Sequence, residues 1–487
     1  MVTAGAKRRL FLLTFPKGRH IMKISETRKK WRFVNQQRLS LTEGSIWKAM
    51  LLFALPVYIG TVCQQFYNAY DSWCVGNFIG ENALAAVSSS GSLIWMMTSF
   101  FNGMAMGAGV VIARYFGAKD YDSMRKAIHT AIAFGFVTGV VMTVIGMGFT
   151  PMILRWMGTP EEVLPQSVSY FRWYFAGAIF IVMYNIFVGI LHAVGDSKHP
   201  LYYLMISTMI NIVLDLLFVA ALGYGVGSAA IATTISQGIS AILCCIHLLR
   251  IDAPYRISLK AIRFDGKSLK DIIRFGLPSA VQNSVISIAN VVVQANINSF
   301  GKSAMAGCGA YAKLEGFTFL PIICFTQALS TFVGQNLGAH QHERTKKGVV
   351  FGLICCCIMA ECIGLFSYLF APQLIGIFIN TPDSIAYGTQ HMQAIAPFFC
   401  LAAFSHCMAA IMRGAGKPTV PMFTMLACWC LFRVAYISVA VKIVNQLTTV
   451  SFAYPITWVL SSVVFLIYYL KADWIHNFDR MEAAGKV

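Results

Sequence analysis

Long apolar stretches recur along this chain, and they restrict its fold more than any other feature. A stretch needs about 20 mainly apolar residues to cross the hydrocarbon core of a bilayer, which is about 30 Å thick. Each stretch is continuously apolar, whereas strands of membrane barrels are short and alternate in polarity. A helix also satisfies all its backbone hydrogen bonds inside lipid. The twelve expected spans cover residues 47–76, 84–112, 127–150, 167–192, 200–222, 226–249, 272–299, 304–333, 348–371, 389–411, 419–441 and 449–470.

Composition places the chain in the same class. Hydrophobic residues make up 57% of it and charged residues only 12%, whereas soluble proteins carry about a quarter charged residues. The 14 cysteines lie in or beside apolar stretches, without metal-site spacing or a secreted-type disulfide framework. The short apolar segment 10–15 ends at Pro16, so no cleaved leader is expected, and translation could start at Met1 or Met22.

Basic residues are distributed unevenly around the predicted spans, which sets the orientation. The formal net charge is +18, and the N-terminal tail to Gly44 alone carries 11 Lys and Arg. The loops on the opposite side carry three basic residues, Arg155, Lys302 and Lys442. Lys and Arg prefer the cytoplasmic side and an anionic inner leaflet. We therefore expect a multi-pass protein of the cell (inner) membrane with both termini cytoplasmic, in contact with membrane lipids and not with nucleic acid.

The chain also repeats itself. Three landmarks recur in one order at nearly one offset, namely residues 53–56 and 275–278, 113–118 and 334–339, and 195–200 and 414–418. Six spans separate the copies, an even number, so both halves enter the membrane in the same sense. The predicted fold class is an all-α polytopic membrane protein, with twelve transmembrane helices as two six-helix bundles related by a pseudo-two-fold axis along the membrane normal.

The repeat also divides the chain into regions. The basic segment between the two bundles links them on the cytoplasmic side. We expect a cytoplasmic N-terminal tail at 1–45, an N-lobe at 46–250, a cytoplasmic linker at 251–271, a C-lobe at 272–470 and a cytoplasmic C-terminal tail at 471–487.

Two aspartates inside the spans are the sharpest functional signal. A charged group within a span is energetically costly and is therefore a candidate for function. Asp71 follows Pro56 by 15 residues, and Asp215 follows Pro200 by the same number. Because a helix rises 1.5 Å per residue, both carboxylates lie about 22 Å from the cytoplasmic starts of their helices. We expect them at one depth in the N-lobe.

The neighbours of these aspartates suit cation binding. Asn211 lies one helical turn before Asp215, while Gln64 and Tyr67 continue the polar stripe that contains Asp71. A hard cation such as Na⁺ prefers oxygen ligands, and the same carboxylates could instead carry a proton. The other interpretation is a polar cluster that merely orients helices.

The second half carries no matching acid pair. The positions that correspond to Asp71 and Asp215 hold Val293 and Arg433, so ion chemistry is expected only in the N-lobe. Glu315 either lines a substrate cavity or anchors a neighbouring helix. His406 either binds substrate or a proton, or is a structural histidine. The sequence assigns no role to Arg433, and Glu361 is expected to pack against an unidentified donor.

The sequence resembles the multidrug and toxic compound extrusion (MATE) family of cation antiporters. The likeness rests on QQFYNAYDSWCVGNFIG at 64–80, GDSKHPLYYLMISTMINIVLD at 195–215 and TFVGQNLGA at 331–339. It implies two six-helix bundles around a central cleft, and a multidrug efflux antiporter that exports lipophilic or cationic drugs or toxins in exchange for Na⁺ or H⁺. It also implies a monomer without a cofactor, and not an enzyme.

The resemblance assigns roles to particular positions. The prokaryotic branch with an N-lobe aspartate pair is the most similar, and its cation site corresponds here to Asp71, Asn211, Asp215, Ala229 and Thr233. Na⁺ would be held by these residues, Ala229 excepted. Asn185 resembles a polar pocket residue of this branch. The candidate substrate-pocket residues are therefore Asn185, Gln64, Tyr67, Glu315 and His406. Another branch uses an acid in the seventh helix, and none occurs between Asp271 and Phe300.

Two alternatives compete with drug efflux. A lipid-linked oligosaccharide or lipid flippase of the same superfamily shares the helices and the repeat, and would need cationic side chains in the cleft, for which Arg433 and Lys313 are the interior candidates. An intramembrane enzyme would need aspartate-rich or histidine-glutamate metal motifs, which the sequence lacks.

Overall fold

The structure, a computed structural model, describes residues 40–156, 159 and 161–483, and the expectations for the tail at 1–39, including the start at Met1 or Met22, lie outside it. All regular elements of the described residues are helical. Those of the first half are α2 (Ile46–Phe78), α3 (Glu81–Gly117), α4 (Tyr121–Trp156), α5 (Leu164–Ala176), α6 (Ala178–Ala193), α7 (Lys198–Asp215), the π-helix η1 (Leu216–Ala221) and α8 (Gly227–Arg250).

The second half begins after a connection that contains the short 3-10 helix η2 (Leu259–Ala261). Its helices are α9 (Gly266–Asn298), α10 (Lys302–Thr318), α11 (Leu320–Gly338), α12 (His342–Leu369), α13 (Ala371–Gly376), α14 (Pro382–Ile395), the 3-10 helix η3 (Ala396–Phe398), α15 (Phe399–Gly414), α16 (Thr419–Met425), the π-helix η4 (Leu426–Phe432), α17 (Arg433–Ile443), α18 (Leu447–Lys471) and α19 (Asn477–Ala483).

The helices confirm the predicted fold class. Among the described residues, ten helical segments are long and apolar enough to cross a membrane, and the bent pair of α5 and α6 makes an eleventh. The twelfth predicted span lies in α3, which has 37 residues and is therefore about 55 Å long.

Several predicted spans are broken where packing or proline requires it. The span at 167–192 bends by 45° between α5 and α6. A side chain at Gly177, between them, would overlap Thr234 of α8, so the break lies where α8 approaches most closely. Pro321 starts α11, and Pro397 lies in η3 between α14 and α15. A proline lacks the backbone N–H that would continue the preceding helix.

Among the described residues, each half has one π-helical segment beside the position that the repeat singles out. In the first half η1 begins directly after Asp215, and in the second half η4 ends directly before Arg433. A π-helical turn takes more residues than an α-helical turn, so it changes which side chains face inward, and such turns are frequent at functional sites. The repeat therefore preserves a local helix irregularity as well as the sequence landmarks.

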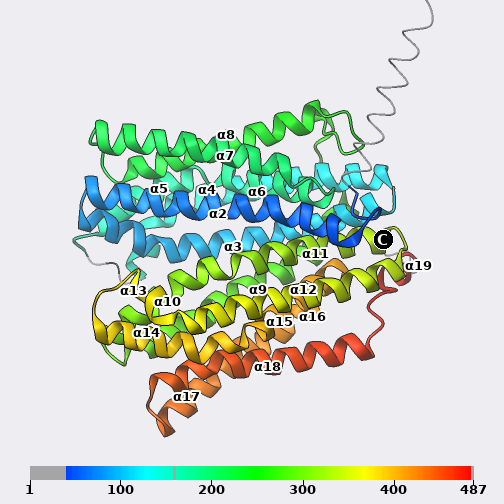
Figure 1. Ribbon diagram of the computed structural model, residues 1–487. Coiled ribbons are helices and arrows are strands. Elements are labelled where there is room, and N and C mark those ends of the chain that lie inside the picture. Colours follow the sequence, from blue (N-terminus) through cyan, green and yellow to red (C-terminus); the bar gives the residue numbers. More distant parts are fainter. Residues whose placement is uncertain (1–39, 157–158, 160, 484–487) are drawn as a thin grey trace, which may run out of the picture. The chain divides into compact units, whose positions relative to one another are not determined.

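The two halves meet along α3, which packs against α9 and α11 (Figure 1). The α3–α9 contact depends on glycine. A Cβ atom added at Gly107 would lie 2.2 Å from the Cα of Gly276, and one at Gly103 would lie 2.4 Å from the Cα of Ala280. The backbones are so close that only glycine fits at positions 103 and 107.

A buried glutamine links the halves at the end of the helices that the charge distribution assigns to the cytoplasm. The side chain of Gln335, at the end of α11, donates to the backbone carbonyl of Ala193 at 2.7 Å and accepts from the backbone N–H of Leu41 at 2.9 Å. Arg114 of α3 forms an ion pair with Glu482 of α19 at 3.0 Å. This end of the interface is therefore closed by specific polar contacts.

The start of the second half is capped by an aspartate outside the apolar segment. Asp265 accepts hydrogen bonds from the backbone N–H of Ser268 at 2.9 Å and from its hydroxyl at 2.8 Å. These hydrogen bonds hold the pKa of Asp265 below its usual range, because they stabilise the ionised carboxylate. The cap sets the first turn of α9, which then leads into the contact with α3.

Candidate functional site

Three helices of the first half bring a group of polar side chains together. Asp71 lies on α2, Asn211 and Asp215 lie on α7, and Thr233 lies on α8, with Ala229 one turn before it. These helices contact one another, α2 with α7 and α7 with α8. Every one of the five residues is buried, and the exposed fractions of Asp71 and Asp215 are 7% and 0%. The two carboxylates therefore do not face the lipid.

Most polar atoms of this group have no hydrogen-bond partner within the described residues. They are one carboxylate oxygen of Asp71, both carboxylate oxygens of Asp215, both side-chain amide atoms of Asn211 and the hydroxyl of Thr233. Buried polar groups are normally hydrogen-bonded, since leaving them unpaired costs about 1–3 kcal/mol or more each. The group is mainly a set of oxygen atoms, which matches the ligand preference of a hard monovalent cation or a proton.

The charge of Asp71 acts on the carboxylate of Asp215. Cys74, one turn after Asp71, directs its thiol toward the backbone carbonyl of Asp215 at 3.9 Å. Two like charges in a buried environment repel strongly, so a cation or a shared proton between them is favourable. The equal spacing of the aspartates from Pro56 and Pro200 predicts the same depth for both.

Sequence reasoning missed three members of this environment. Tyr170 and Tyr174 lie one turn apart on α5, and Gln237 lies one turn after Thr233 on α8. The side chain of Gln237 lies beside the hydroxyl of Tyr67, and the charge of Asp71 acts on both α5 tyrosines. The i,i+4 spacing of the two tyrosines was the available signal, but nothing in the sequence shows that α5 faces this site.

The remaining pocket candidates of the first half lie in different places. Tyr67 is buried next to the aspartates, whereas Gln64, almost one turn before it, is half-buried. Asn185 lines a cavity of about 80 Å³ between the halves, walled by α3, α6 and α11. Its side chain donates to the backbone carbonyl of Ile181 at 2.8 Å. The structure thus assigns Asn185 to the interface between the halves.

Polar side chains of both halves line this interface cavity. Gln327 of α11 and His192 of α6 are hydrogen-bonded across it at 2.8 Å, and Asn102 of α3 contributes a further amide. Phe53 packs edge-on against the imidazole of His192, with ring centroids 5.4 Å apart. The lining contains no Lys or Arg. The cavity therefore offers neutral hydrogen-bonding groups and small apolar side chains.

The second half buries an arginine where the first half buries Asp215. Arg433 is 1% exposed. Its guanidinium donates to Thr457 at 2.9 Å and to Asn290 at 3.4 Å, and it lies over the ring of Tyr454 at 4.5 Å. Glu315 contributes the opposite charge, as an electrostatic partner of Arg433. These contacts show which side chains surround Arg433, a residue to which the sequence assigned no role.

The other acid and histidine candidates of the second half have local partners. Glu315 accepts a hydrogen bond from the hydroxyl of Tyr311 at 3.4 Å. His406 packs edge-on against Trp429, with ring centroids 5.3 Å apart. Glu361 lies on an exposed face of α12, and the thiol of Cys400 is near it.

Removing the positive charge of Arg433 should destabilise the second half. In Arg433→Gln, Glu315 loses the nearby positive charge that balances it electrostatically, and an unbalanced charge in a largely buried site is destabilising. We expect a lower apparent unfolding temperature of the purified protein in detergent. The double variant Arg433→Gln with Glu315→Gln should regain part of the loss, because no unpaired charge is left. Equal unfolding temperatures of the two variants would contradict this pairing.

Comparison with known proteins identifies a matching protein family. The model of the family described as MatE matches two segments of the chain, residues 56–217 and 278–439. The two matches coincide with the two halves of the repeat, and each starts at one of the prolines Pro56 and Pro278. Together they cover well over half of the chain.

Curated relatives extend over most of the chain. The probable multidrug resistance protein YoeA of Bacillus subtilis is 28% identical over 396 residues, covering 80% of this chain and 86% of the relative. The probable multidrug resistance protein NorM of Thermotoga maritima is 26% identical, over 78% of this chain and 83% of the relative. These relatives and the family are transporters and not enzymes.

Solved structures share the fold. One is described as the outward-facing conformation of a multidrug resistance MATE family transporter of the MOP superfamily, with a TM-score of 0.82 and 23% identity, covering 92% of this chain and 98% of that one. Another, MATE in complex with MaL6, has a TM-score of 0.82 and 24% identity, covering 92% of this chain and 99% of that one.

Proposed function

The chain belongs to the MatE family, and from this premise we propose that it is a secondary active efflux transporter that exchanges Na⁺ or H⁺ for lipophilic, cationic drugs or toxins. The observation that carries the proposal is the buried group around Asp71 and Asp215, whose oxygen atoms lack hydrogen-bond partners within the described residues. Such a group is costly in a membrane unless it binds a cation or a proton during the transport cycle.

In this proposal the coupling ion acts by shifting a conformational equilibrium. An ion entering from outside binds at Asp71, Asn211, Asp215 and Thr233, with Ala229 leaving room beside them. Binding favours the conformation that releases the drug, and the ion then leaves toward the cytoplasm. A ligand can shift such an equilibrium only if it binds the two conformations with different affinity. The contacts of α2 with both α7 and α11 connect this site to the second half.

The finer assignments belong to the same proposal. The chain is placed in the prokaryotic branch with an aspartate pair in the N-lobe at 46–250, and the C-lobe at 272–470 supplies no coupling carboxylate. The linker at 251–271 joins the lobes, and the tails are 1–45 and 471–487. Support comes from Val293 and Arg433, both buried, at the positions that match the two aspartates.

Location and partners follow from charge and from the family. The described helices make this a multi-pass membrane protein. We place it in the inner membrane with both termini cytoplasmic, because the basic residues gather on that side. It is proposed to act as a monomer without a cofactor, on small-molecule substrates, in contact with lipids through its exposed apolar side chains.

The flippase alternative depends on basic residues in the cleft, and the structure gives it little support. The guanidinium of Arg433 is already engaged by Thr457 and Asn290. Lys313 is exposed and lies over the ring of Phe378, at 5.9 Å from its centroid. A pyrophosphate would need both cations free and directed into one cavity.

Counter-flow in proteoliposomes tests the proposal and identifies the ion. A fluorescent cationic dye is enclosed, and a Na⁺ gradient and a pH gradient are imposed separately. We expect one of the two gradients to accelerate dye movement, relative to liposomes without protein. A rate of dye movement that changes with neither gradient would contradict antiport.

A further inference from the structure

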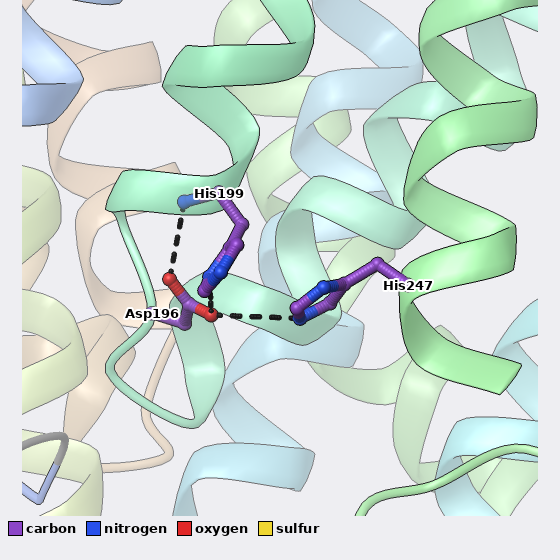
Figure 2. Close-up of side chains that lie close together, drawn as sticks. All are labelled: Asp196, His199 and His247. Atoms are coloured by element: carbon purple, nitrogen blue, oxygen red, sulfur yellow. Dashed lines mark hydrogen bonds and ion pairs between the residues drawn. The ribbon is translucent and has the colours of Figure 1, made fainter. Parts of the chain in front are cut away.

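A second group of potential ligands lies at the other end of α7 and α8, away from the aspartate pair. Figure 2 shows Asp196, His199 and His247 directed toward one another. Asp196 lies in the turn between α6 and α7, His199 in the first turn of α7, and His247 in the last turn of α8. The sequence contained Asp196 and His199 in the landmark at 195–200, but the transport proposal uses neither of them.

The carboxylate of Asp196 is held in place by two different sets of contacts. One oxygen, Oδ1, accepts the backbone N–H groups of Lys198 and His199, each at 3.2 Å, and thereby caps α7. The other oxygen, Oδ2, faces the two imidazoles, at 2.6 Å from Nδ1 of His199 and 3.9 Å from Nε2 of His247. The side chain is 2% exposed. One oxygen thus fixes the carboxylate, while the other is hydrogen-bonded to Nδ1 of His199, a contact that a shared metal ion would replace.

The two imidazoles are arranged for convergence on one point. Their ring centroids are 4.1 Å apart, and the rings are inclined by 32°. One ligand atom from each of the three residues lies within 4.8 Å of the other two. Ligands at about 2.0–2.1 Å from a tetrahedral metal are separated by about 3.3 Å. The distances from Asp196 Oδ2 to the two imidazole nitrogens, 2.6 and 3.9 Å, lie on either side of this value. Small side-chain rotations would therefore bring the three atoms into a geometry that can hold a metal ion.

Two atoms in this region lack hydrogen-bond partners within the described residues. Nε2 of His247 is one, and the buried hydroxyl of Tyr255 is the other. Tyr255 belongs to the connection between the halves, and its hydroxyl interacts electrostatically with Asp196. A metal ion bound beside Asp196 would give Nε2 of His247 the partner that it lacks. The side chain of His199 is 42% exposed, so the site can be reached from solvent.

We propose that Asp196, His199 and His247 bind a divalent transition metal ion such as Zn²⁺. Two imidazoles and one carboxylate form a ligand set used by zinc sites that keep a fourth position open for water. Nitrogen ligands disfavour Ca²⁺ and Mg²⁺, which require oxygen. A bound ion would connect the α6–α7 turn to the end of α8, and so fix the cytoplasmic ends of the two helices that carry Asp215 and Thr233.

The chain offers an internal comparison in a second group, His340, His342 and Asp479. Its carboxylate is 32% exposed, and its histidines are 55% and 25% exposed. None of its ligands is buried as Asp196 is, so we assign the metal site to Asp196, His199 and His247. The second group could still bind metal weakly and obscure the measurement. The parent for the test is therefore the full chain with His340→Ala and His342→Ala.

The experiment titrates this tag-free parent in detergent with Zn²⁺ alone by calorimetry, and with Co²⁺ alone by visible absorption. We expect one Zn²⁺ per chain, a tetrahedral Co²⁺ spectrum and a higher unfolding temperature with Zn²⁺. His199→Gln with His247→Gln in the same parent should lose the spectrum and at least tenfold in affinity. Asp196 is left intact, because it also caps α7.

Three results would overturn the site. They are no Zn²⁺ binding by the parent, equal binding by parent and double variant, or a Co²⁺ spectrum that survives the two substitutions. The single variant His199→Gln serves if the double variant does not fold, since the exposed His199 side chain tolerates replacement. It should also lose the tetrahedral spectrum, and retention would count against the proposal. Dye efflux is not needed for any of these measurements.

Discussion

Asp71→Asn and Asp215→Asn should each abolish ion-driven efflux, with at least a tenfold loss of gradient-dependent dye transport. Asparagine preserves the size of the side chain but can neither carry a proton nor balance a bound cation. Both aspartates are buried, and their carboxylates interact, so each variant removes half of the negative charge at one site. The measurement is counter-flow in proteoliposomes containing equal amounts of protein.

Membrane insertion should be unaffected, because an amide is cheaper to bury than a charged carboxylate. Glu361→Gln is the matched control, since it removes a carboxylate from an exposed face of α12 in the second half. It should transport like the unmodified protein. Normal gradient-driven efflux by either aspartate variant would refute the coupling site, and an equal loss in Glu361→Gln would show that the effect is not specific.

Gly107→Leu should abolish transport by a different route, through the contact between the halves. A Cβ atom at position 107 would lie 2.2 Å from backbone atoms of Gly276. Carbon atoms rest about 3.5–4.0 Å apart, so α3 and α9 must separate by about 1.5 Å. No side-chain rotation relieves a clash with backbone, and the closed arrangement of the halves becomes inaccessible. We expect at least a tenfold lower transport rate.

Hydrogen exchange can locate this effect. Amides at the end of α3 and the start of α9 should exchange faster in Gly107→Leu, because the tight contact that protects them is lost. Gly309→Leu in α10 is the control, since a Cβ atom there has no neighbour within 4 Å. Unchanged exchange and transport in Gly107→Leu would show that the α3–α9 contact is not required for the cycle.

The helices were predictable because hydrophobic length is a local property of the chain. Each predicted span corresponds to one helix or to a run of two or three consecutive helical segments, and the repeat was visible from landmarks such as Pro56 and Pro278. The breaks were less predictable. The bend at Gly177 depends on Thr234, which lies 57 residues further along the chain and is adjacent only after α5 and α8 have packed.

The candidate site, like the helices, was only partly predictable from the sequence. Equal spacing from proline placed Asp71 and Asp215 at one depth, and the structure buries both. Their coupling role remains a prediction. Tyr170, Tyr174 and Gln237 were missed, because helix periodicity shows which residues share a face but not which helix that face meets. Asn185 was predicted to line a substrate pocket, and in the structure it lines the cavity between the halves.

By itself, the sequence determined the number of membrane helices, their order and the doubling of the chain, since these follow from hydropathy and spacing along one dimension. Only the tertiary structure decided which polar atoms are left without partners and which distant residues meet. It joined His247 to Asp196 across the ends of α7 and α8, and it surrounded Arg433 with Thr457, Asn290 and Tyr454. Such contacts depend on the rotation and packing of whole helices, which no local pattern of residues specifies.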